Sequence, residues 1–260
     1  MTPRRSRKRS VNVIPALCGD DISGGGNDTG SSLIEMSIVI VIAGLLIGAV
    51  VGGQSLMSGA RLKNLASEVQ NYEAAVINFK SFYEELPGDM TKSYQYWGNN
   101  VGCSNNLASA GGDGCNGNGD GNISWQDEQY RAWQFMAVTK LIPGQYSGVS
   151  SNIQGGATIS INVPKSRFKD GGFSLMSYHN GNLGDIGSVI LNIGRQNDAS
   201  TPSNALFNYN EMYNLDEKID NGILFGPDSG KLKWDSGADS NGCGTIDGTE
   251  RCQAFYVIVK

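Results

Sequence analysis

The stretch from residue 33 to residue 51, LIEMSIVIVIAGLLIGAVV, is a run of 19 residues in which only Glu35 and Ser37 are strongly polar. An α-helix rises about 1.5 Å per residue, so this run is close to the ~30 Å thickness of the hydrocarbon core of a bilayer. We interpret residues 33–51 as a membrane-spanning helix. The alternatives are a buried core helix and a secretory signal peptide, although no A-x-A-like cleavage site follows the run.

The residues ahead of this run form a polar leader with a basic cluster, Arg4, Arg5, Arg7, Lys8 and Arg9. Basic residues next to a membrane helix favour the cytoplasmic side, so we expect the N-terminus inside and the rest of the chain outside. The leader holds 5 of the 20 basic and 3 of the 25 acidic residues, which leaves residues 31–260 with a net charge of −7. An acidic chain of this kind does not favour nucleic acid as a partner.

The residues around the start of the run carry a family resemblance. The segment GSSLIE, with Gly30, Leu33, Ile34 and Glu35 followed by the apolar helix, resembles the N-terminus of type IV pilins and type II secretion pseudopilins. Ser31 stands where that family usually has phenylalanine. The resemblance implies cleavage after Gly30 by a prepilin peptidase and methylation of the new N-terminus at Ser31. It also implies that Glu35 pairs with the N-terminal ammonium of a neighbouring subunit.

The same resemblance implies an organisation for the whole chain. Residues 1–30 are a cleaved cytoplasmic leader, residues 31–54 form the transmembrane and assembly helix, and residues 55–260 form an amphipathic helix with an extracytoplasmic head. The expected location is the bacterial inner membrane and then a pilus or pseudopilus. The expected partners are the prepilin peptidase, other pilin or pseudopilin subunits and the inner-membrane assembly machinery.

The segment after the apolar run carries an apolar stripe at helical spacing. Its members alternate three and four residues apart and are Leu62, Leu65, Val69, Tyr72, Val76, Phe79 and Tyr83. This spacing predicts an amphipathic helix that ends at Pro87-Gly88 and needs a globular head to cover its stripe. A coiled coil along the stripe is the alternative.

The rest of the chain reads as one α+β head with an antiparallel sheet. Helices are expected over residues 125–144 and 203–222, where Pro143-Gly144 and Gly222 end them. Short β-branched or alternating runs predict strands at residues 157–164, 173–178, 188–193, 231–234 and 254–260. The long N-terminal helix would pack on this sheet, as in pilins.

Four cysteines follow the leader, in addition to Cys18 within it. They are Cys103, Cys115, Cys243 and Cys252, and they allow three pairings. We expect the two local disulfides, Cys103–Cys115 and Cys243–Cys252, because the compartment outside the inner membrane is oxidising. The alternative is that these cysteines bind zinc, but the chain has no C-x-x-C motif and a single histidine, His179.

Catalytic signatures are weak in this sequence. A serine or cysteine hydrolase needs a nucleophile beside a base, and a G-x-S-x-G motif is missing. The match GDGCNG at residues 112–117 has no apolar strand before it, so we interpret it as a loop. We therefore expect a non-enzymatic structural subunit, a minor pilin or pseudopilin. The alternative is a membrane-tethered extracytoplasmic binding domain that does not polymerise.

Residues 116–127, NGNGDGNISWQD, resemble a calcium-binding loop of the EF-hand type. Such loops place oxygen ligands at alternate positions and a glycine at the sixth, here Gly121. The expected ligands are Asn116, Asn118, Asp120, Asn122 through its backbone carbonyl, and Asp127. With only two carboxylates among them, we expect weak affinity, on the order of 10⁻⁴–10⁻³ M. A flexible surface loop pinned by Cys115 is the alternative.

Overall fold

The structure is a computed structural model of the 260-residue chain. It describes residues 33–109, 112–125, 127–151, 156–177, 187–197, 200–222, 230–235, 243, 249–250 and 252–259. Gly30, Ser31, Cys18 and His179 lie outside these residues. The chain divides into two compact units, Met1–Val51 and Gly52–Lys260.

The described part of the first unit is helical. Helix α1 (Leu33–Tyr83) begins in this unit, and every residue from 33 to 51 is exposed. Among the described residues, α1 is the one helix long and apolar enough to cross a membrane. A helix of this length and composition near the N-terminus is compatible with a single-pass membrane protein. A signal sequence near the N-terminus meets the same criteria of length and apolar composition.

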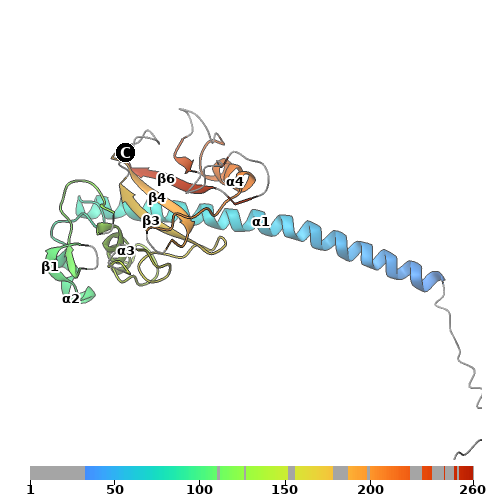
Figure 1. Cartoon of the computed structure of the whole chain (residues 1–260), viewed down its shortest axis with the longest axis horizontal. Coiled ribbons are helices and arrows are strands. Elements are labelled where there is room, and N and C mark those ends of the chain that lie inside the picture. The colour runs from blue at the N-terminus through green and yellow to red at the C-terminus, as the bar shows by residue number, and fades with distance from the viewer. Residues whose placement is uncertain are drawn as a thin grey trace, which may run out of the picture. The chain divides into compact units, whose positions relative to one another are not determined.

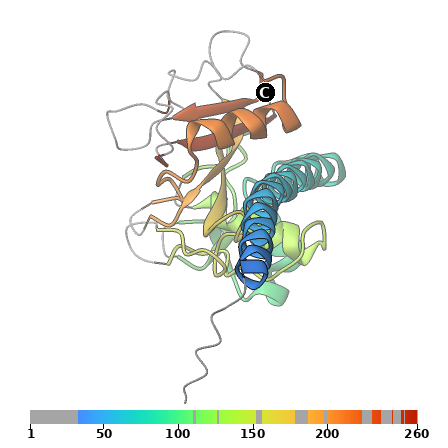
Figure 2. The same cartoon turned by 90° about the vertical axis from the view of Figure 1, so that its right-hand side faces the viewer.

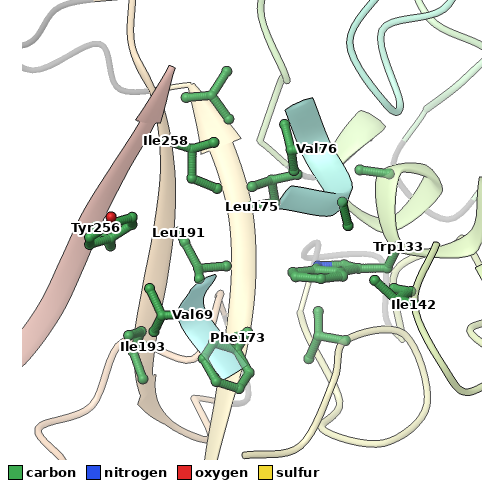
Figure 3. Packing of buried hydrophobic residues seen from close by; sticks show 14 of the residues in the cluster. Val69, Val76, Trp133, Ile142, Phe173, Leu175, Leu191, Ile193, Tyr256 and Ile258 are labelled. Atoms are coloured by element: carbon green, nitrogen blue, oxygen red, sulfur yellow. The ribbon is translucent and has the colours of Figure 1, made fainter. Parts of the chain in front are cut away.

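In the second unit, the remaining part of α1 supplies one wall of the hydrophobic core. Leu65, Val69, Val76 and Phe79 are completely buried, and Tyr72 is partly buried against the same cluster. Figure 3 shows Val69 and Val76 facing the strand residues Leu175 and Leu191. The apolar stripe is therefore covered by the chain's own head, as the amphipathic pattern predicted, and the coiled-coil alternative does not apply to it.

The head contains a four-stranded antiparallel sheet in the order β3-β4-β6-β5 (Figure 1). Its strands are β3 (Gly171–Ser177), β4 (Val189–Arg195), β5 (Leu232–Asp235) and β6 (Gln253–Val259). The antiparallel α+β class expected from the sequence is confirmed. Helix α4 (Tyr209–Ile219) lies beside the C-terminal strands, as Figures 1 and 2 both show.

Two expected helices are shorter in the structure. Helix α3 covers Glu128–Val138, where residues 125–144 were expected, because Lys140 adopts a positive φ of 60° and the N–H groups of Leu141 and Ile142 turn back to the Met136 carbonyl. Helix α4 begins only after Asn208, which forms a reciprocal capping box with Glu211.

One predicted strand is wrong, and three short elements were missed. Residues 157–164 form a turn, because the Asn162 side chain accepts a hydrogen bond from the Thr158 N–H and competes with strand pairing. The missed elements are α2 (Ser93–Val101) and a parallel pair of β1 (Ser104–Leu107) and β2 (Gly114–Asn116). Their sequences are rich in Asn, Ser and Gly and carry little apolar periodicity.

The four cysteines after the leader form the two local pairs expected from the sequence. Cys103 is bonded to Cys115 with Cα atoms 5.5 Å apart, and Cys243 is bonded to Cys252 with Cα atoms 4.9 Å apart. The first bridge joins the end of α2 to β2, directly before the expected calcium loop. The second bridge lies at the start of β6, where Cys252 also pairs with Phe207 through the backbone.

Candidate functional site

Glu35 is the first residue with a candidate role that the structure describes. It lies in the first turn of α1, and its side chain is exposed. A carboxylate at a helix N-terminus is stabilised by the positive end of the helix dipole. The structure therefore places Glu35 at the exposed start of the apolar helix, and it does not describe Gly30 or Ser31.

The second candidate site is the glycine-rich loop after β2. The Asn118 side chain accepts a hydrogen bond of 2.9 Å from the Asp120 N–H, and the Asp120 carboxylate accepts one of 2.8 Å from the Asn122 N–H. The Asn118 amide also donates to Asp120 over 3.1 Å. Three of the five residues expected as ligands, at alternate positions, are thus linked to one another by hydrogen bonds.

The other two expected ligands are used differently. Asn116 accepts a hydrogen bond from the Tyr94 N–H and donates to Asn105, so its side chain ties the loop to α2 and β1. Asp127 precedes α3 without capping it, and one of its carboxylate oxygens is buried without a hydrogen-bond partner in the described residues. Burial raises the pKa of Asp127 above its ordinary value.

Asp89 is a residue of this site that the sequence did not indicate. Its side chain is 2% exposed, and its carboxylate accepts hydrogen bonds from the N–H groups of Gly119, Asp120 and Gly121 at 2.7, 3.2 and 2.8 Å. Burial raises the pKa of Asp89 to about 6, and repulsion from Glu128 and Asp120 adds to the effect, although two of the loop N–H groups oppose it. The loop is therefore wrapped around a buried carboxylate from a distant segment.

Glu128, the first residue of α3, supplies a second carboxylate to the loop. It is 2% exposed and bridges two loop positions, accepting from the Asn118 N–H at 2.9 Å and from the Ser124 N–H at 2.8 Å. Close packing explains one glycine here: a Cβ on Gly117 would lie 2.2 Å from the Asp89 backbone. Sequence spacing indicated Glu128 only as the residue after Asp127, the last expected ligand, and no local signal links Asp89 to a loop thirty residues away.

The loop has the oxygen-rich side chains that a hard cation prefers, but most of them are engaged with backbone N–H groups. Within the described residues, no three His, Cys, Asp or Glu side chains converge in a way that would hold a metal ion. Asn118 and Asp120 are exposed, while Asp89 and Glu128 bring two buried negative charges behind the same backbone. The arrangement concentrates negative charge beneath a turn built from small residues.

The raised pKa of Asp89 leads to a pH-dependent prediction for the second unit, residues 52–260, which contains the complete core cluster. The pKa of Asp89 is about 6 in the folded state and ordinarily 3.8, so the folded state takes up the proton first as the pH falls. The stabilisation that the protonated Asp89 carboxyl contributes is present at low pH and is lost as the pH rises through 6. The free energy of unfolding of the wild type, minus that of Asp89→Asn, should therefore decrease between pH 4 and pH 7.

This difference is measured by urea unfolding with a chelator present, so that no divalent cation contributes. Glu85→Gln serves as a control, because Glu85 also accepts a backbone hydrogen bond, from Thr91, but is only partly buried. A difference for Asp89→Asn that stays constant across this pH range would contradict the prediction.

Comparisons with known proteins identify no relative of this chain. No protein-family model, no curated protein and no solved structure matches the chain.

Proposed function

We propose that this chain is a structural subunit, a minor pilin or pseudopilin, of a type IV pilus or type II secretion-like filament. It is cleaved after Gly30 and assembles through its N-terminal helix. One observation carries the proposal: the segment GSSLIE leads into a single helix, α1, that is exposed and apolar from residue 33 to 51 and then packs into an α+β head. One helix thus serves as anchor and as core element.

Cleavage after Gly30 provides the test. The full chain is expressed in bacteria that contain an active prepilin peptidase, and the intact mass of the membrane-extracted protein is measured. We expect the mass of residues 31–260, with or without one methyl group on Ser31. A protein that keeps residues 1–30 under these conditions would instead support the membrane-tethered binding domain that does not polymerise.

We also propose that the glycine-rich loop binds calcium. The donor set fits a hard cation, because the exposed side chains of Asn118 and Asp120 are hydrogen-bonded to each other and the buried carboxylates of Asp89 and Glu128 add negative charge behind them. Bound calcium would offset this charge and hold the loop against the head. Its role is to order the segment, and it takes part in no chemistry.

Calcium should raise the melting temperature of residues 52–260. At ten times the dissociation constant, binding to the folded state adds about 1.4 kcal/mol, which for a domain of this size is a rise of about 3–5 °C. Melts are compared in calcium, in magnesium and in chelator. Asp120→Ala should abolish the rise, whereas Asn122→Ala should keep it because that position would bind through its backbone carbonyl. Equal melts in all three conditions would show that there is no site.

A further inference from the structure

A hollow of about 590 Å³ lies between α1 and loops of the head, within the second unit. Its lining comes from α1 between residues 64 and 78, from the loop after α3 at residues 141–144 and Tyr146, and from Lys165 and Arg167. Ligand sites in proteins commonly have volumes of roughly 300–1,000 Å³ and combine apolar surface with a few polar groups. The hollow therefore has the size and the mixed lining of a ligand site.

The wall that the loop after α3 supplies is held in place by contacts within the head. The Ile142 N–H donates to the Met136 carbonyl at 3.3 Å. The Tyr146 hydroxyl donates to the Pro143 carbonyl at 3.3 Å. Gly144 adopts a φ of 105°, which favours glycine, and a Cβ there would lie 2.9 Å from the Tyr146 hydroxyl. The hollow is therefore formed in the single chain before any ligand arrives, as ligand sites usually are.

Helix α1 lines the hollow with neutral polar groups that the head does not use. In the part of the chain that the structure describes, the amides of Asn64, Asn71 and Asn78 make no hydrogen bond. The Tyr72 hydroxyl makes none there either, although its ring packs edge-on against Trp133. Burial raises the pKa of Tyr72 above its ordinary value, so its hydroxyl remains a donor at neutral pH. Amides and hydroxyls both donate and accept, so this lining suits a ligand rich in hydroxyl groups.

One end of the hollow is charged. The segment that carries Lys165 and Arg167 is fixed to Glu68, whose carboxylate accepts hydrogen bonds from the Ser166 hydroxyl at 2.9 Å and the Arg167 N–H at 3.2 Å. The Arg167 guanidinium approaches Glu68 with Nε at 3.7 Å, and its side chain is 80% exposed. Asn78 lies ten residues beyond Glu68, or about 15 Å along α1. The hollow thus has a charged end and a neutral end.

The charged end favours an anion. Lys165 and Arg167 both line it, whereas residues 31–260 as a whole carry a net charge of −7. Lys165 is paired with the exposed carboxylate of Asp170 at 3.0 Å, so Arg167 is the cation more open to a ligand. The planar guanidinium of an arginine can hold a carboxylate with two parallel hydrogen bonds.

We propose that this hollow binds an acidic saccharide. A carboxylate of the saccharide binds at Arg167, and its hydroxyl groups bind along Asn71, Asn78 and Tyr72. The ring C–H groups of the sugar pack on the apolar surface that Tyr146 supplies. The inference goes beyond the proposed function, because it concerns the head whether or not the chain assembles into a filament.

An acidic peptide would fit this lining less well. A peptide offers one N–H and one carbonyl group per residue, and an acidic peptide also repeats its charge along its whole length. Among the described lining residues, cations lie at one end only, and the end near Asn78 is neutral. A saccharide instead carries several hydroxyl groups on each ring, which the amides and the Tyr72 hydroxyl can bind.

Isothermal titration calorimetry of the full chain in detergent tests the proposal, with a chelator present so that no calcium is shared with the sugars. The acidic ligands are tetragalacturonate, a hyaluronan tetrasaccharide and sialyllactose. Maltotetraose is the neutral comparison, and tetraglutamate is the acidic peptide. We expect at least one acidic saccharide to bind about tenfold more tightly than both comparisons, because a hydrogen bond to a charged group contributes about 1.5–3 kcal/mol. High salt should weaken this binding, since Arg167 is exposed.

Variants locate the binding in the hollow. Arg167→Gln should weaken it about tenfold, and Asn71→Ala or Tyr72→Phe about three- to tenfold, which is the range for charged and neutral hydrogen bonds. Asn214→Ala is the matched control, because Asn214 is an exposed asparagine on a different helix, α4, and its loss should change nothing. Thermal melts of each variant check that the head remains folded.

Three results would overturn the proposal. The first is that none of the three acidic saccharides binds at millimolar concentration. The second is that Arg167→Gln and Asn71→Ala bind as tightly as the unaltered chain, which would place the binding elsewhere. The third is that maltotetraose or tetraglutamate binds as tightly as the acidic saccharides, which would show that the hollow does not select for both charge and hydroxyl groups.

Discussion

Trp133→Ala is expected to destabilise the second unit by about 3–5 kcal/mol, a large part of the stability of an ordinary domain. The side chain is completely buried on α3, and its ring meets Tyr72 of α1 edge-on with centroids 5.1 Å apart. Figure 3 shows it between the α1 residue Val76 and Ile142. Truncation would leave a cavity where α1, α3 and β3 meet, and α1 would lose part of its packing against α3.

The measurement is denaturant unfolding of residues 52–260. Trp125→Ala is the matched control, since Trp125 lies a few residues before α3 but is 46% exposed, and its loss should cost less than about 1 kcal/mol. If Trp133→Ala were as mild as Trp125→Ala, α3 would not be the link between α1 and the sheet.

Glu35→Ala is expected to remove the chain from filaments while membrane insertion and cleavage after Gly30 continue. In the proposed filament the carboxylate pairs with the Ser31 ammonium of a neighbouring subunit. Removing one partner of a buried ion pair costs about 3–5 kcal/mol, or roughly two to four orders of magnitude in an equilibrium constant. Incorporation is measured by immunoblotting sheared filaments against the membrane fraction of the same cells.

Glu35→Gln separates charge from size, because the amide keeps the shape of the side chain and loses its charge. We expect it to fail in incorporation nearly as strongly as alanine. Ser37→Ala is the control, since Ser37 lies in the same turn and its hydroxyl, within the described residues, donates only to the Ile34 carbonyl. Normal incorporation of Glu35→Ala would mean that Glu35 is only a carboxylate at the end of a helix.

Much of the head could be predicted because its signals are local. The strands β4 and β6 are dense in β-branched and aromatic residues, β3 has the apolar residues Phe173 and Leu175 at alternate positions, and the stripe on α1 keeps its spacing of three and four over three heptads. The strand expected at residues 157–164 does not form. The reason is also local, but the sequence pattern indicates it only weakly. A single side chain, Asn162, bonds to the backbone at Thr158 and turns the chain.

The sequence by itself determined the apolar helix with Glu35 at its start, the amphipathic continuation and the oxygen-rich loop around Asp120, because each depends on residues a few positions apart. Only the tertiary structure decided what lies beneath that loop. Asp89 reaches Gly121 across 32 positions, and Glu128 closes the loop from the first turn of α3. Buried polar groups need hydrogen-bond partners, and these partners can come from segments that are far apart in the sequence. The spacing of residues along the chain does not indicate which distant segment supplies a partner.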